Sequence, residues 1–183
     1  MSSNKALRAV TECAVFVAMA LALSYLKIPI GLAFGGFGGS IDLVMIPLIV
    51  FAVHRGLGWG LLAGLVFGTI KYFIGAHADI SWISIIFDYS VAYAFVGFAG
   101  LLRRQPRQLW LAALIGCFGR FVIHFIRGIT IYAMYMEDIF GLPMTNVWVY
   151  SALYNGSYML PNTALAVVLC AILGTSLYKQ LLK

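Results

Sequence analysis

The segment Trp82–Leu101, WISIIFDYSVAYAFVGFAGL, constrains the fold of this chain more than any other stretch. Twenty helical residues rise about 30 Å, which is the thickness of the hydrocarbon core of a bilayer. The segment contains one formally charged residue, Asp88, which lies well inside it. A carboxylate at that depth costs roughly 2.5–3.5 kcal/mol on insertion scales, so it should face a partner, a cavity or a ligand rather than lipid. Asp88 is therefore either half of an ion pair between helices or a contact for a cationic or hydrogen-bond-donating substrate.

Composition places the rest of the chain in a membrane as well. Of the 183 residues, 63% are hydrophobic and 10% are charged, whereas a soluble domain has about 25% charged residues. The apolar runs are continuous rather than alternating, which predicts helices and not barrel strands. The net charge of +6 does not indicate nucleic-acid binding, because the cations stand at the ends of apolar runs and form no basic stripe. We expect an all-α membrane protein that forms one substrate-binding domain over residues 1–183.

Six hydrophobic segments follow one another along the chain, and we expect six transmembrane helices. The first could instead be a signal peptide, but alanines at four-residue spacing from Ala14 favour a retained helix with a smooth packing strip. The second is too short to span alone unless the bilayer thins or the residues before it contribute. The sixth is long and is interrupted by Pro161. The segments are 9–26, 41–53, 57–74, 80–102, 109–134 and 147–178.

The distribution of cations sets the expected orientation. Eight of the twelve Lys and Arg residues stand on the side that holds the chain termini, and the positive-inside rule assigns that side to the cytoplasm. Both termini are then cytoplasmic. The glycine-rich segment 31–40, GLAFGGFGGS, faces outward and is expected to be a flap, because it is too flexible for a helix. It lacks the Lys-Ser/Thr ending of a phosphate-binding loop.

Polar residues of three hydrophobic segments fall at one depth in the outer half of the bilayer. On the fifth segment Arg120, His124 and Arg127 stand at i, i+4 and i+7, so they share one helix face. Aromatic rings with an acid, a base and a carboxamide suit a small, flat heterocycle that carries a cation or an amino group. We therefore expect an outward-opening pocket. The candidate pocket residues are Asp88, Tyr89, Arg120, His124, Tyr132, Tyr150 and Asn155.

Each of these residues also has a structural interpretation. Arg120 could neutralise Asp88, His124 could be a packing histidine, and Asn155 could hydrogen-bond between helices. The sequence contains no nucleophile with an obvious base and no HExxH zinc motif, so we expect no catalysis, no cofactor and no metal. A channel is disfavoured, because no repeat or loop resembles a selectivity filter.

Three motifs carry a family resemblance: FDYSVAYAFVGFAGLLRR at 87–104, RFVIHFIRG at 120–128 and VYSALYNGSYMLP at 149–161. With a weaker match, GGSIDLVMIP at 38–47, they make the chain similar to the thiamine-specific S components of energy-coupling factor (ECF) vitamin transporters. The resemblance covers nearly the whole chain. It implies an S-component bundle of six helices in the cell membrane that captures thiamine with high affinity and has no ATPase of its own. It also implies a transmembrane coupling subunit and two cytoplasmic ATPases as partners.

The resemblance assigns roles position by position. Asp88 matches the acidic residue that holds the aminopyrimidine, and Asp42 matches a residue near the flap. Ala14 and Ala18 match the pair that docks on the coupling subunit. The remaining pocket positions are matched by Tyr89, Arg120, His124, Tyr132, Tyr150 and Asn155.

Arg127 is an extra cation beside a pocket for a cationic vitamin. It could pair at the rim with Glu137 or Asp138, or it could indicate a phosphorylated ligand or a different vitamin. Two alternative functions therefore stay open. One is an S component for another heterocycle, such as a thiamine precursor or phosphate ester, and the other is a stand-alone facilitator for small solutes.

Overall fold

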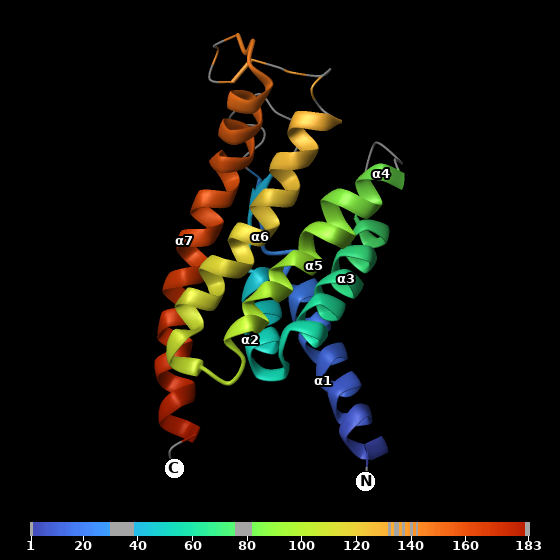
Figure 1. The fold of residues 1–183 in the computed structure, drawn as a ribbon, viewed down its shortest axis with the longest axis vertical. Coiled ribbons are helices and arrows are strands. Elements are labelled where there is room, and N and C mark those ends of the chain that lie inside the picture. Colours follow the sequence, from blue (N-terminus) through green and yellow to red (C-terminus); the bar gives the residue numbers. More distant parts are fainter. Residues whose placement is uncertain are drawn as a thin grey trace.

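The computed structural model describes residues 2–29, 39–75, 82–131 and 143–181, with the single positions 133, 136, 138, 139 and 141. The predicted flap lies outside the described residues except for its last two positions, and Tyr132 lies outside them as well. The described chain is a bundle of helices with one short two-stranded sheet (Figure 1).

Long apolar runs form the helices, because in lipid every backbone N–H and C=O must be satisfied within its own segment. Among the described residues, five helical segments are long and apolar enough to cross a membrane. The α-helices are α1 (Ser2–Leu23), α2 (Met45–Arg55), α3 (Leu57–Ile74), α4 (Trp82–Ser84), α5 (Ala92–Val96), α6 (Leu109–Thr130) and α7 (Val147–Leu181). The other elements are the strands β1 (Ile28–Pro29) and β2 (Ser40–Ile41), the π-helix η2 (Ile85–Val91) and the 3₁₀-helices η3 (Gly97–Leu102) and η4 (Pro106–Gln108).

The second hydrophobic segment forms α2, which has 11 residues and is shorter than a membrane span. Most of its side chains are buried, and Leu48, Ile49 and Phe51 belong to the main hydrophobic core. This agrees with the expectation that the segment is too short to span alone. It fills the interior of the bundle, between the helices that are long enough to cross.

The segment Trp82–Leu101 is helical throughout, but its winding changes along its length. One turn of α-helix leads into η2, which is followed by α5 and then by η3. A π-turn widens the helix and is frequently found at functional sites. Here it contains Asp88 and Tyr89, so the irregular winding occurs where the sequence places its membrane-buried carboxylate.

Glycines bring α3 very close to this irregular segment. Gly60, Gly64 and Gly68 follow one another at one-turn spacing along α3, so they lie on one face of the helix. A Cβ atom added at Gly64 would overlap the backbone carbonyl of Tyr93, and each of the other two would also meet backbone atoms of the segment. The two backbones are therefore in direct contact, which sets the position of the turn that carries Asp88.

Helices α6 and α7 lie side by side, and both chain termini lie at the same end of the molecule (Figure 1). The sequence predicts an interruption of the sixth segment at Pro161, and this prediction is wrong. The 35-residue α7 continues through Pro161. Membrane helices tolerate an internal proline, since neighbouring groups can satisfy the carbonyl that loses its hydrogen bond.

Helix ends and the small sheet also differ from the sequence-based expectation. The first helix begins at Ser2 and ends at Leu23, earlier at both ends than the predicted 9–26, and the fifth ends at Thr130 instead of residue 134. Strands β1 and β2, which the hydropathy pattern does not predict, pair antiparallel on the two sides of the predicted flap. The pairing brings the two ends of that segment together.

Candidate substrate-binding site

Asp88 contacts two side chains of α6. The guanidinium of Arg127 forms an ion pair with the Asp88 carboxylate, and His124 Nδ1 lies 3.5 Å from its other oxygen, Oδ1. All three side chains are largely buried, with exposed fractions of 16% for Asp88, 9% for His124 and 8% for Arg127. The expectation that Asp88 faces a partner inside the bundle is therefore met by two residues of the predicted i, i+4, i+7 face.

Arg120, the third residue of that face, does not pair with Asp88 in the structure. Its Nε donates to Nε2 of His124 at 3.3 Å, and its guanidinium carbon lies 4.2 Å from the centre of the Tyr93 ring. The hypothesis that Arg120 neutralises Asp88 is wrong, because Arg127 occupies that role. Among the described residues, Nη1 of Arg120 is buried and has no hydrogen-bond partner, which leaves a donor for an acceptor on a ligand.

Helix α7 adds a carboxamide to the same group of side chains. Asn155 Nδ2 donates to the backbone carbonyls of Ser151 at 2.9 Å and His124 at 3.3 Å. The Tyr158 hydroxyl donates to Asn155 Oδ1 at 2.8 Å. The backbone of Gly128 lies against the Ser151 side chain, since a Cβ atom there would overlap it. Close approach of α6 and α7 thus allows Asn155 to bridge them.

Three aromatic rings of α7 pack against one another in a row, and the last of them contacts His124. The Tyr150 and Tyr154 rings are stacked, with centroids 5.8 Å apart, and the Tyr154 and Tyr158 rings meet edge to face at 6.1 Å. The Tyr158 ring then meets His124 edge to face at 6.0 Å. Sequence reasoning selected Tyr150 but missed Tyr158, although its position three residues after Asn155 was sufficient to place both on one helix face.

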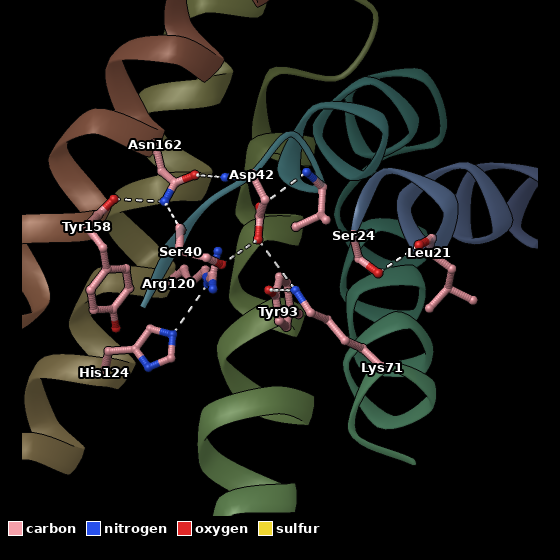
Figure 2. Close-up of polar contacts among 11 residues, drawn as sticks. Leu21, Ser24, Ser40, Asp42, Lys71, Tyr93, Arg120, His124, Tyr158 and Asn162 are labelled. Atoms are coloured by element: carbon pink, nitrogen blue, oxygen red, sulfur yellow. Dashed lines mark hydrogen bonds and ion pairs between the residues drawn. The ribbon is translucent and has the colours of Figure 1, made fainter. Parts of the chain in front are cut away.

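A second polar group surrounds Asp42, directly after β2 (Figure 2). Lys71 Nζ lies 3.5 Å from Asp42 Oδ2 and donates to the Tyr93 hydroxyl at 2.8 Å. Asn162 of α7 accepts from the Asp42 backbone N–H at 2.9 Å and donates to the Ser40 carbonyl at 2.7 Å. These bonds attach the β2 end of the predicted flap to α7. Sequence reasoning did not select Lys71 or Asn162.

Figure 2 shows that the two polar groups are adjacent, with the side chains of Asp42, Arg120, His124 and Tyr158 directed toward a common region. The Tyr93 ring connects them, since Lys71 and Arg120 both lie near it, at 5.1 Å and 4.2 Å from its centre. The structure therefore brings Asp42, Asp88, Arg120, His124 and Asn155 together from four parts of the chain.

The other predicted site residues have different surroundings. The Tyr89 ring on η2 meets Tyr72 of α3 edge to face at 5.4 Å. Ala14 and Ala18 are exposed on α1, whereas their chain neighbours Cys13 and Val17 are buried in the core. The alanines therefore present surface to a partner or to lipid.

The predicted rim partners of Arg127 are Glu137 and Asp138. Asp138 is exposed, and Glu137 lies outside the described residues, whereas Arg127 pairs with Asp88.

Across the described ranges, no three His, Cys, Asp or Glu side chains are grouped as they would be around a metal ion. The two polar groups around Asp42 and Asp88 instead contain opposite charges, amide and hydroxyl donors and aromatic rings. Such a set suits hydrogen bonding to, and stacking on, an organic ring.

Comparison with known proteins finds relatives that match almost the whole chain. Thiamine transporter ThiT of Lacticaseibacillus paracasei is 29% identical, over 96% of this chain and 90% of the relative. Thiamine transporter ThiT of Bacillus subtilis is 28% identical, over 96% of this chain and 95% of the relative. A solved structure of ThiT from Listeria monocytogenes superposes with a TM-score of 0.80 and 26% identity, and the match covers 96% of this chain and 98% of that one.

The sequence model of the family described as thiamine transporter protein (Thia_YuaJ) matches residues 10–182. That family consists of membrane transporters rather than enzymes, and the apolar helices fit a multi-pass protein of the cell membrane. The chain therefore belongs to the thiamine transporter family.

Proposed function

We propose that this protein is the substrate-capturing S component of an ECF-type importer and that it binds thiamine with high affinity at the Asp88 site. The observation that carries the proposal is the largely buried Asp88 carboxylate on the π-turn, opposite His124 and near the Asn155 carboxamide. Thiamine joins an aminopyrimidine to a cationic thiazolium. A buried carboxylate can accept a charge-assisted hydrogen bond from the amino group, and aromatic rings can stack on the cation.

The transport part of the proposal rests on the family membership and on α1. The protein would capture thiamine from outside and deliver it through a transmembrane coupling subunit driven by two cytoplasmic ATPases. Ala14 and Ala18 would form the docking strip, because small exposed residues let another helix approach closely.

Binding is tested on the detergent-purified protein. Mass spectrometry identifies any heterocycle that co-purifies, and isothermal titration of the ligand-free protein with thiamine should show one site. The isolated aminopyrimidine precursor, titrated in parallel, should bind more weakly, since it lacks the thiazolium. Absence of thiamine binding to folded protein would contradict the proposal.

Coupling is tested with Ala18→Trp, which should abolish thiamine uptake in cells and leave thiamine binding unchanged. A large ring on the docking strip prevents close helix approach without touching the Asp88 site. Phe118→Trp on the exposed side of α6 is the matched control, because it also places an indole on the outside of the bundle. Proteoliposomes that contain this chain alone should not take up thiamine, and uptake by them would indicate a stand-alone facilitator.

A further inference from the structure

Glu12 is a carboxylate within the hydrophobic helix α1, and the proposed thiamine site does not use it. It lies in Asn4–Leu23, one of the segments that are long and apolar enough to cross a membrane. A carboxylate in such a segment is costly unless it has a partner. One partner here is Arg55, the last residue of α2, so an ion pair joins the two helices.

The contact between Glu12 and Arg55 has the geometry of a strong ion pair. Arg55 Nε donates to Glu12 Oε2 at 2.6 Å, and Arg55 Nη2 lies 2.6 Å from Glu12 Oε1. A guanidinium that engages both oxygens of a carboxylate fixes the direction of the contact as well as its length. The exposed fractions of the two side chains are 23% for Glu12 and 20% for Arg55. Salt therefore screens this pair less than it screens a pair on the surface.

Two further basic side chains contact the same carboxylate. Arg8 Nε donates to Glu12 Oε1 at 2.9 Å, but Arg8 belongs to α1 itself and is 76% exposed. His54 Nε2 lies 3.2 Å from Glu12 Oε2, and its side chain is also exposed. Of the three basic residues, His54 and Arg55 connect α1 to α2, and Arg55 makes the two-point contact. Arg8 does not connect the helices, so it offers a control.

The ion pair has an apolar neighbour between the same two helices. One turn further along α1, the Phe16 ring packs against the Phe51 ring of α2, with the ring centroids 5.4 Å apart. Contacts between apolar side chains are non-directional, so the ion pair defines the rotation of α1 about its own axis more closely. The fully buried hydrophobic side chains of α1 are no larger than valine and are those of Ala9, Cys13, Val17 and Ala20.

The turn after α2 gives Arg55 a fixed position. Gly56 follows it with a φ of 99°, a backbone conformation that favours glycine. The Arg104 backbone N–H donates to the Val53 carbonyl at 2.8 Å, so the loop after η3 is bonded to the last turn of α2. Glu12 therefore attaches α1 to a part of the bundle that backbone hydrogen bonds hold in place.

We propose that the pair of Glu12 and Arg55 fixes the rotation of α1 and thereby directs Ala14 and Ala18 toward the coupling subunit. The inference rests on the proposed function, in which these alanines form the docking strip. At about 100° per residue, they lie roughly 160° and 120° around α1 from Glu12. When Glu12 faces α2, the two alanines therefore face away from α2, and both are exposed. Glu12 and Arg55 are positioning residues for transport, and thiamine binding at the Asp88 site does not depend on them.

The first test compares uptake with binding in Glu12→Gln, which removes the charge and keeps the size of the side chain. Thiamine uptake is measured in cells that also express the coupling subunit and both ATPases, per molecule of folded protein. It should fall about tenfold or more, because a charge-assisted two-point contact is lost. The thiamine affinity of the purified variant, measured by titration, should stay within about twofold of the wild type. Unchanged uptake overturns the inference, and so does a loss of affinity as large as the loss of uptake.

Arg8→Gln is the matched control, because it removes a cation from the same carboxylate without separating α1 from α2. Its uptake should stay within about twofold of the wild type, since an exposed pair within one helix contributes little. The exchange of Glu12→Arg with Arg55→Glu restores an ion pair between the two positions and should recover most of the uptake. An exchanged pair that folds and binds thiamine but does not transport it overturns the inference.

A distance measurement tests the position of α1 directly. Leu7 of α1 and Gly58 of α3 are exposed and can carry spin labels. Pulsed electron paramagnetic resonance in lipid nanodiscs then gives the distribution of distances between the two helices. The labelled wild type and Arg8→Gln should give one narrow distribution, and Glu12→Gln should give a broader or shifted one. A distribution that Glu12→Gln leaves unchanged overturns the inference.

The same experiments separate failure of the inference from failure of the proposed function. Wild-type protein that does not bind thiamine contradicts the proposed function and the inference with it. Wild-type protein that takes up thiamine without a coupling subunit contradicts the docking of α1, which also overturns the inference. If Glu12→Gln and Arg55→Gln both fail to fold, the pair serves the stability of the bundle. That outcome overturns the inference and leaves the proposed function intact.

Discussion

At η2 and the start of α5, the helical segment Ile85–Leu102 meets α3 and α6 in different ways. Toward α3 the closest contact is backbone against backbone, made possible by glycines such as Gly64 and Gly68, and side-chain contacts such as Lys71–Tyr93 lie beside it. Toward α6 the contact at η2 is made by the charged and hydrogen-bonding side chains of Asp88, His124 and Arg127, while further along the segment Gly119 and Gly116 of α6 lie against the backbone carbonyls of Phe95 and Val96.

This difference explains how one irregular helical segment can be fixed in position and still bind a ligand. Backbone contact has no adjustable side chains, so the α3 face sets the position of η2 closely. Polar side chains can exchange partners, so the α6 face can accept a ligand. We infer that the glycine-mediated backbone contact between α3 and this segment stays unchanged when a ligand binds.

The largest effect is expected from Gly64→Ala. The added Cβ atom would overlap the Tyr93 carbonyl, so the two backbones must separate, at a cost of about 3 kcal/mol or more in the free energy of unfolding. Unfolding by dodecyl sulfate in mixed micelles measures this cost. Gly58→Ala is the matched control on the same helix, since nothing lies within 4 Å of its Cβ position.

The control variant should be as stable as the wild type or more so, because alanine favours a helix over glycine by about 0.5–1 kcal/mol. Equal stability of the two alanine variants would show that the glycines of α3 are not needed for its close contact with the neighbouring segment. The comparison between the two faces would then fail.

The next largest effect is expected from Asp88→Asn, which should weaken thiamine binding by about 1.5–3 kcal/mol, or roughly ten- to a hundredfold. The amide keeps the shape of the side chain but cannot accept a charge-assisted hydrogen bond from the aminopyrimidine. Binding is measured by titration per folded molecule, and the folded fraction is measured alongside it.

Some loss of stability should accompany this change, because Arg127 loses its carboxylate. The double variant Asp88→Asn with Arg127→Gln should recover that stability without recovering thiamine affinity. A well-folded Asp88→Asn protein with unchanged affinity would remove Asp88 from the binding site and reduce it to a structural residue.

The smallest effect is expected from Tyr158→Phe. The Tyr158 hydroxyl donates to Asn155 Oδ1 at 2.8 Å and so orients the carboxamide that bridges α6 and α7. Loss of one such hydrogen bond costs about 0.5–1.5 kcal/mol, which corresponds to roughly two- to tenfold weaker binding. The phenyl ring keeps the edge-to-face contact with His124, so stability should change little.

Tyr25→Phe provides the reference for this measurement, since the Tyr25 side chain is 72% exposed and outside the polar groups. If the two variants bind thiamine equally well, the Tyr158 hydroxyl does not orient the site. Thiamine binding at the Asp88 site would then depend on its charged side chains and not on this hydrogen bond.

Residue types and their spacing were enough to predict the features that depend on local chemistry. Continuous apolar runs predict membrane helices, because an unsatisfied backbone cannot exist in lipid. A single carboxylate inside an apolar run predicts a buried partner or ligand, and the spacing of Arg120, His124 and Arg127 places them on one face. Each of these conclusions needs only the residue types and the helical period.

Which groups meet depends on how the helices pack. Asp88 pairs with Arg127 and not with Arg120, and Lys71 belongs with Asp42 although 29 positions separate them in sequence. Which charged side chains pair depends on the winding of η2 and on how closely the glycines of α3 let η2 approach that helix. A difference of one helical turn moves a side chain by about 5.4 Å, which is more than the reach of an ion pair. Contacts between helices therefore depend on packing that no single segment of the sequence encodes.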